Sequence, residues 1–271
     1  MRTFIVTTDF SDIAENAVEY AATGASIMDA KIILFNSFKL PLHASNTILS
    51  VENVQAMIDK NKRRLEDRAK DLIKRYDIKV EVESTLLNVE DEVERLIEHY
   101  NAEIVIMGMA QRSLEQDLLG NTTTNVIQKL KFPVLAVPLG VTFKPVKRIL
   151  YACDVVRGVQ KKVLDRIKDI AQSWNAEIEV FNVQEKVAAL QDEASHPADF
   201  LKEEMDSIQY FYKNVASNAI IKEIKNEIVN YQPDLIIMVP NRYGFWASIV
   251  HRSKTRMMAA GLDVPLLSIP L

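Results

Sequence analysis

Apolar runs of strand length alternate along the chain with amphipathic stretches of helical length. The runs at 3–8, 31–38, 103–108 and 133–138 predict buried strands, and 79–85 alternates as a half-exposed strand does. Between them, 11–29, 52–76 and 89–100 carry apolar residues at helical spacing. The expected core positions of the first of these helices are Ala14, Val18, Ala21, Ala22 and Ala25. Such alternation predicts an α/β fold with a parallel sheet and helices on both faces.

The same pattern occurs twice. Segments 148–154, 175–182, 234–239 and 264–270 match 4–9, 29–36, 103–108 and 132–138 in turn. The offset between matched residues is 146 for Asn182 and Asn36 but only 131 for Met238 and Met107. The second copy is therefore shorter than the first, and we expect its second helix to be the shortened element. We predict two homologous doubly wound domains with five-stranded parallel sheets, 1–142 and 143–271, joined near Gly140–Lys147.

Composition narrows the function classes. The chain has 271 residues, 48% of them hydrophobic, and a net charge of −4, which favours neither nucleic acid nor an anionic membrane as partner. Its longest apolar stretches are strand-sized and its first residues do not resemble a secretory signal. Cys153, the single cysteine, is interpreted as a small core residue. We therefore expect a cytoplasmic protein with no membrane and no nucleic-acid partner.

The stretch MGMAQRSLEQDLLGNTTTN, residues 107–125, leaves the carboxyl end of the fourth predicted strand, where ligands bind in such folds. Gly108 and Gly120 would let a phosphate approach the backbone, and Arg112 could add a charge. The Asn-Thr-Thr-Thr cluster at 121–124 adds polar groups beside the free N–H groups of a helix start. A turn followed by a threonine N-cap explains the same residues, and from local sequence alone it is the commoner interpretation.

Four segments carry a family resemblance over almost the entire chain. VTTDFS (6–11) resembles the opening V-P-T-D-F-S of universal stress proteins, and DAKIILFNSF (29–38) resembles their second strand. EIVIMGM (103–109) and GNTTTNVIQKLKFPVLAVP (120–138) resemble their fourth strand and closing segment. The chain resembles a tandem protein of this family. That resemblance implies an adenine nucleotide alpha hydrolase-like fold in which the closing strands 133–138 and 265–270 pair, giving an intramolecular pseudo-dimer; a homodimer of chains is left open.

The resemblance also implies a nucleotide site. Family members that bind ATP carry Gly, two residues, Gly, nine residues, Gly, then Ser or Thr. Gly108 fits the first position, Gln111 occupies the second, and Gly120 comes one residue early, followed by Asn121 and Thr122. We therefore expect ATP or AMP, with Mg²⁺ if a triphosphate is bound, in the N-terminal domain.

Further residues acquire roles from the same resemblance. The implied nucleotide-binding set includes Thr7, Thr8, Asp9, Phe38 and Met107. Asp9 would lie towards the ribose or adenine, and the strand end from Asn36 to Phe38 would flank the adenine. A turn residue ahead of a helix capped by Ser11 or Asp12 explains Asp9 equally well, and one carboxylate could do both.

The second copy departs further from the motif. Val239 replaces the first glycine, while Arg252 and Ser253 stand opposite Gly120 and Asn121. Arg252 and Ser253 predict at most a weak anion-binding corner.

Catalytic chemistry has little support in the sequence. The four histidines are scattered without metal-ligand spacing, so we expect no metal site, and neither a Walker A loop nor a G-x-S-x-G elbow occurs, so we expect no catalytic residues. The basic residues of 60–64 are interpreted as the solvated face of a helix with i,i+4 pairs.

The leading hypothesis is a stress-response binding module that is not an enzyme, with slow ATP hydrolysis left open. The alternative is a nucleotide-free protein-interaction scaffold with a degenerate glycine motif and unknown protein partners. A third interpretation, an enzyme acting on small phosphorylated metabolites, has the least support.

Overall fold

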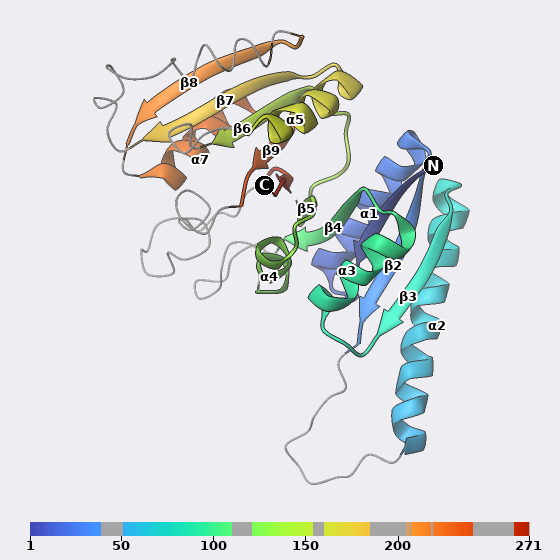
Figure 1. Cartoon of the computed structure of the whole chain (residues 1–271). Coiled ribbons are helices and arrows are strands. Elements are labelled where there is room, and N and C mark those ends of the chain that lie inside the picture. Colours follow the sequence, from blue (N-terminus) through green and yellow to red (C-terminus); the bar gives the residue numbers. More distant parts are fainter. Residues whose placement is uncertain are drawn as a thin grey trace. The chain divides into compact units, whose positions relative to one another are not determined.

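A computed structural model describes residues 1–38, 51–109, 121–153, 160–184, 205, 207–217, 219–240 and 263–270. The chain forms two compact units (Figure 1). The first comprises Met1–Met109 and Leu139–Phe143, and the second comprises Ala110–Pro138 and Lys144–Leu271. None of the helices described is both long and apolar enough to cross a membrane.

The first unit contains a parallel sheet of four strands in the order β3-β2-β1-β4. The strands are β1 (Arg2–Thr7), β2 (Ala30–Ser37), β3 (Val80–Thr85) and β4 (Ile104–Met109). Helices α1 (Asp12–Met28) and α2 (Val51–Tyr76) pack against one another, and α3 (Val89–Tyr100) covers the opposite face of the sheet (Figure 1). The parallel α/β architecture predicted from the alternating pattern is confirmed.

Helix α1 shows how the local sequence determines an element. Ser11 occupies the N-cap, and its Oγ accepts a hydrogen bond from the N–H of Ala14 at 3.3 Å. The helix ends at Asp29, whose left-handed backbone closes the last turn. All five predicted core positions of α1 are buried. Small alanines on this face let the helix lie close to the sheet, which matters for the site below.

The second unit repeats the order of the first. Its strands run β5-β10-β9-β6-β7-β8, so β6, β7, β8 and β9 are arranged as β1, β2, β3 and β4 are. The strands are β5 (Val134–Pro138), β6 (Arg148–Cys153), β7 (Glu177–Gln184), β8 (Tyr210–Ala216), β9 (Leu235–Met238) and β10 (Leu266–Ser268). The helices are α4 (Asn121–Lys129), α5 (Lys161–Trp174) and α7 (Ile220–Tyr231). The internal repeat read from the sequence therefore reappears in the strand order.

The closing strands of the two repeats pair with each other. β5 and β10 run antiparallel, with Leu267 opposite Leu135, whereas β10 with β9, β9 with β6, β6 with β7, and β7 with β8 are parallel pairs. Both strands are buried along their length, because apolar residues face each side of the sheet. The expected pairing of 133–138 with 265–270 is thus present, while the pseudo-dimer as an assembly of two domains remains a prediction.

Some local expectations were wrong. The apolar spacing of 52–76 places Ile73 on the buried side of α2 together with Leu65, Ala69 and Leu72, but 43% of the surface of Ile73 is exposed. Asn88 occupies the N-cap of α3 without a side-chain hydrogen bond to the helix. Strand β8 was not identified from the sequence: its residues are only half-buried or exposed, and the two kinds do not alternate along its whole length. The segment between β7 and β8, where the shortening is expected, lies largely outside the described residues. So do Phe245 and Trp246, an aromatic pair that the sequence favours as the cover of a core edge.

Candidate functional site

The strand order of the first unit creates a switch point between β1 and β4. The chain passes from β1 to β2 on one side, then crosses from β3 to β4 on the other side of β1. β1 and β4 are parallel neighbours, with Val6 opposite Ile106, so their carboxyl ends lie at the same edge. Ligands of open α/β sheets bind outside the carboxyl ends of strands at such a point. The turn after β1, which carries Asp9, lies at this edge.

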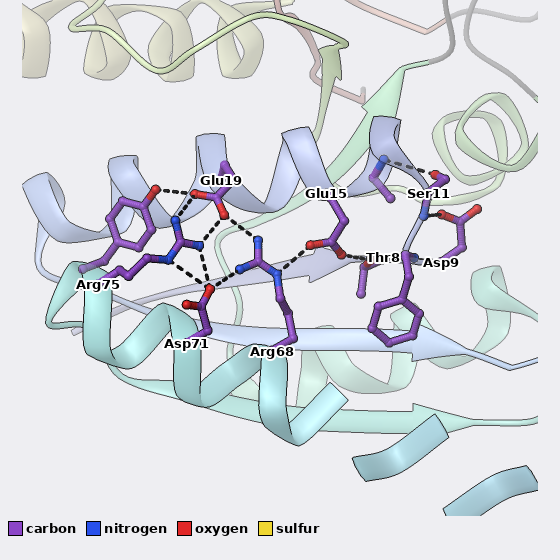
Figure 2. A network of polar contacts seen from close by, with 11 residues as sticks. Thr8, Asp9, Ser11, Glu15, Glu19, Arg68, Asp71 and Arg75 are labelled. Atoms are coloured by element: carbon purple, nitrogen blue, oxygen red, sulfur yellow. Dashed lines mark hydrogen bonds and ion pairs between the residues drawn. The ribbon is translucent and has the colours of Figure 1, made fainter. Parts of the chain in front are cut away.

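The turn after β1 is held by its own side chains (Figure 2). The Oγ1 of Thr8 is buried, accepts a hydrogen bond from the N–H of Phe10 at 2.9 Å and donates one to Glu15 at 2.7 Å. The Oδ1 of Asp9 accepts the N–H of Ser11 at 3.0 Å, so Asp9 forms the turn proposed as one of its two roles. The carboxylate of Asp9 nevertheless stays exposed to solvent. A ligand could therefore reach it without the turn being dismantled.

Phe10 adopts an unusual backbone conformation in this turn. Its φ angle is 63°, in the left-handed region that bulky residues avoid at a cost of about 1 kcal/mol or more. The guanidinium of Arg64 on α2 lies over the Phe10 ring, 3.9 Å from its centroid. This cation–π contact, together with the bond from Phe10 N–H to Thr8, offsets part of the strain. Helix α2 thus helps to fix the shape of the loop that presents Asp9.

A buried amide at the end of β2 supports the same turn. The Nδ2 of Asn36 donates to the carbonyl oxygen of Thr8 at 2.6 Å, and its Oδ1 accepts from Asn61 at 2.7 Å. Asn182 occupies the matching position of the second repeat, is also buried, and donates to Asn214 at 2.9 Å. The family resemblance places Asn36 at the strand end that flanks the adenine, but the support that its amide gives to the turn was not predicted. The available signal was the Phe-Asn pair that ends an apolar strand in both copies.

An ion-pair network joins this turn to the α1–α2 interface (Figure 2). Glu15 accepts the bond from Thr8 and pairs with Arg68 at 2.6 Å. Arg68, only 16% exposed, also pairs with Glu19 and with Asp71, each at 2.6 Å. Arg75 then contacts Glu19 and Asp71. Interpreting the charges of α2 as a solvated face therefore missed a network that connects two helices.

The carboxyl of Glu19 is strongly favoured as an anion. Burial raises its pKa, but hydrogen bonds from Arg75, Tyr76 and Arg68 outweigh that effect and lower the pKa from 4.5 to about 2.

This shift predicts how acid affects the first unit. Since the folded pKa lies below the unfolded one, the stabilisation is complete above pH 4.5 and is lost as the pH falls towards 2. The loss should be about 1–2 kcal/mol, because Glu19 is partly exposed and solvent screens the pairs. Hydrogen exchange of α1 peptides at a series of pH values would measure it. Glu19→Gln should flatten this acid dependence, whereas Glu94→Gln, at an exposed position of α3, should not; equal profiles would contradict the role of Glu19.

Close packing explains Gly108 without any ligand. A Cβ at this position would lie 2.7 Å from the carbonyl oxygen of Ile13 and 2.8 Å from its Cγ2. These distances are shorter than real Cβ contacts, so α1 can approach β4 only because residue 108 lacks a side chain. Met107 is 3% exposed, and its side chain belongs to the core.

The remaining predicted residues are distributed over the chain. Thr7 ends β1 and Phe38 follows β2; both are partly buried, and the N–H of Phe38 donates to the carbonyl of Thr85 at 2.8 Å. Asn121 and Thr122 open helix α4, as the sequence predicted, within the second compact unit. The other predicted positions, namely Gln111, Gly120, Arg252 and Ser253, lie outside the described residues. Over the part of the chain that is described, no cluster of three or more His, Cys, Asp or Glu side chains could hold a metal ion.

Comparison with known proteins agrees with this architecture. The chain matches the universal stress protein family over residues 1–138. It is 30% identical over 151 residues to a universal stress protein of Methanocaldococcus jannaschii, covering 48% of this chain and 90% of that protein. The crystal structure of a universal stress protein from Archaeoglobus fulgidus has a TM-score of 0.73 at 18% identity and covers 99% of this chain and 98% of its own. A putative universal stress protein from Pseudomonas aeruginosa has a TM-score of 0.61 at 13% identity, covering 100% of this chain and 93% of its own. With its family match extending over half of its length, the chain belongs to the universal stress protein family.

Proposed function

We propose that the N-terminal half of this chain binds an adenine nucleotide, ATP or AMP, at the carboxyl edge of β1 and β4. The observation that carries the proposal is the turn at Asp9: its backbone is fixed by buried Thr8, while its carboxylate is exposed at the switch point. A prebuilt turn lowers the ordering cost of binding. Membership of a family whose glycine motif this chain partly retains supports the same ligand.

Each predicted residue is assigned to the part of the nucleotide that it would contact. Asp9 would accept hydrogen bonds from ribose hydroxyls or the adenine amino group, with Thr7 beside it and Phe38 flanking the base. The phosphates would meet backbone N–H groups of the Gly120–Thr122 segment and the amide of Gln111, with Mg²⁺ if three phosphates are present. Because packing already accounts for Gly108, the phosphate assignment depends on the later part of the motif.

Calorimetric titration with ATP and with AMP tests the role of Asp9. In Asp9→Asn, the side-chain oxygen can still accept the N–H of Ser11, so the turn persists while the charge is removed. In Asp9→Ala, both the turn acceptor and the charge are lost. If the carboxylate contacts the nucleotide, both variants should weaken binding by about 10-fold or more, corresponding to the loss of one or two charge-assisted hydrogen bonds.

A different pattern would assign Asp9 to the turn alone. In that case Asp9→Asn binds nucleotide as the natural chain does, and Asp9→Ala alone loses stability, by about 1 kcal/mol. A thermal melt of each variant, recorded beside the titration, separates loss of folding from loss of binding.

A nucleotide-free interaction scaffold is the second candidate. Gln111 favours it, because a side chain stands where ATP-binding members have the second glycine. The absence of heat with millimolar ATP and AMP would leave the scaffold, and micromolar binding abolished by Gly120→Val would exclude it. In either case we propose a cytoplasmic stress-response module that is not an enzyme. Slow ATP hydrolysis, formation of a homodimer and anion binding at Arg252 and Ser253 are further properties that this proposal leaves open.

A further inference from the structure

The second unit buries two glutamates between its sheet and α7. Glu179 on β7 is 8% exposed and Glu227 on α7 is 4% exposed. Their carboxyl groups lie within hydrogen-bonding reach of each other, at the interface where α7 packs on β6 and β7. Among the described residues, no group donates a hydrogen bond to the buried Oε1 of Glu179. Two facing acids with an unsatisfied oxygen are unusual, because burying an uncompensated charge is costly.

The surrounding groups leave this pair short of positive charge. The Nζ of Lys213, on β8, pairs with Glu227 and is itself half-exposed. On β7, Glu177 points to the same face two residues before Glu179, and it is an acid as well. Lys213 thus acts on both carboxylates: it pairs with Glu227 and opposes the rise in the pKa of Glu179.

Three neighbouring polar groups, from α7 and β6, have partners elsewhere. The hydroxyl of Tyr231 donates to the carbonyl of Glu177 at 3.5 Å, and Arg148 on β6 donates to the carbonyl of Tyr231 at 2.8 Å. Glu223, one helical turn before Glu227, accepts a bond from Ser217 at 3.1 Å. The charge that would balance the pair is thus not supplied by these side chains.

We propose that Glu179 and Glu227 together bind one proton at neutral pH and that release of this proton loosens α7 from β7. With the proton in place, one carboxyl donates a hydrogen bond to the other, while Lys213 balances the remaining negative charge. Without it, two buried carboxylates repel each other at the helix–sheet interface. Burial, followed by the charge of Glu227, raises the pKa of Glu179 to about 7 despite the opposing effect of Lys213, which supports this geometry.

The sign of the pH dependence follows from the direction of the shift. Between the ordinary pKa of 4.5 and about 7, the folded state binds a proton that the unfolded chain has lost. Stability of the second unit is therefore highest below this window and falls as the pH rises through it. From pH 5.5 to pH 8 we expect the unfolding equilibrium constant to increase roughly 10- to 30-fold.

Intrinsic fluorescence isolates the relevant unit. Both tryptophans of the chain, Trp174 and Trp246, belong to the second compact unit, so selective tryptophan excitation during urea unfolding reports on that unit. The full-length chain is unfolded with urea at pH 5.5, 6.5, 7.2 and 8.0. These values are about one pH unit or less apart and lie on both sides of the expected titration midpoint.

The natural chain is compared with three variants. Glu179→Gln keeps the shape and an N–H donor towards Glu227 but cannot ionise, so it should abolish the pH step and be more stable than the natural chain at pH 8. Lys213→Met removes the cation and should move the step to higher pH. Glu177→Gln, on the same face of the same strand, is the matched control and should retain the step.

The outcomes are decisive in both directions. A natural chain whose stability is flat from pH 5.5 to 8, or a Glu179→Gln variant that keeps the step, overturns the proposal. Should a variant fail to fold, carboxyl-carbon NMR of the natural chain labelled at glutamate decides: a carboxyl titrating near 7 supports the shared proton. Titration of every glutamate near 4.5 contradicts it. None of these results depends on nucleotide binding.

Discussion

Gly108→Ala is expected to destabilise the first unit by about 1–3 kcal/mol. The added Cβ would lie 2.7 Å from the carbonyl oxygen of Ile13, so the backbone of α1 has to move away from β4. No rotamer change relieves a contact between a Cβ and a backbone atom, in contrast to contacts between the ends of flexible side chains. Thermal melts by circular dichroism and hydrogen exchange of α1 and β4 peptides would measure the loss.

Gly24→Ala supplies the matched control. A Cβ there would meet the ring of Phe143 at 2.9 Å, which is a side chain that can rotate away, and alanine favours the helical backbone by up to about 1 kcal/mol. We expect little net change or a small gain. If Gly108→Ala were as stable as the natural chain, the close packing of α1 on β4 would be wrong. Loss of nucleotide binding in this variant would be informative only if its fold is intact.

Arg68→Met is expected to cost the first unit about 2–3 kcal/mol. Arg68 is 16% exposed and pairs with Glu15, Glu19 and Asp71, so its removal leaves partly buried carboxylates without their shared cation. The value is below that of a fully buried pair because Glu19 and Asp71 are partly exposed to water. Chemical unfolding, with exchange of α1 and α2 peptides as the local readout, would test it.

Lys70→Met, on the same helix, is the control that distinguishes loss of the ion-pair network from loss of an exposed surface charge. Lys70 pairs with Asp67 at 2.9 Å, but 71% and 73% of the two side chains are exposed, so no measurable change is expected. Arg68→Met should also loosen the bond between Glu15 and Thr8, which holds the turn at Asp9. Equal effects of the two variants would contradict a special role for Arg68.

Most elements could be predicted because their signals are local. Strand-length apolar runs gave β1, β2 and β4 within one residue at each end, and alanine spacing gave the buried face of α1. The matched segments of the two copies gave the repeat, and pairing of β5 with β10 followed from the family resemblance. Strand β8 was missed, since an edge strand is only partly buried and its pattern is weak.

The turn at Asp9 was predictable from the sequence, but the contacts that support it were not. The turn at Asp9 follows from Asp and Ser placed ahead of a helix, and both its bonds are formed. Gly108 was singled out for the approach of a phosphate, whereas in the described structure the group that lies close to it is the backbone of Ile13 in α1. The support given by Asn36 was not seen, because its partners, Thr8 and Asn61, come from β1 and α2.

By itself, the sequence determined the alternation of strands and helices, the repeat, the family and the location of the turn that carries Asp9. Periodicity and capping act over a few residues, so they can be read directly from the chain. Only the tertiary structure decided which charges meet: Arg68 with the glutamates of α1, and Glu179 with Glu227. Such contacts join residues that are about 50 positions apart, and their energies depend on burial, which no local pattern of charges encodes.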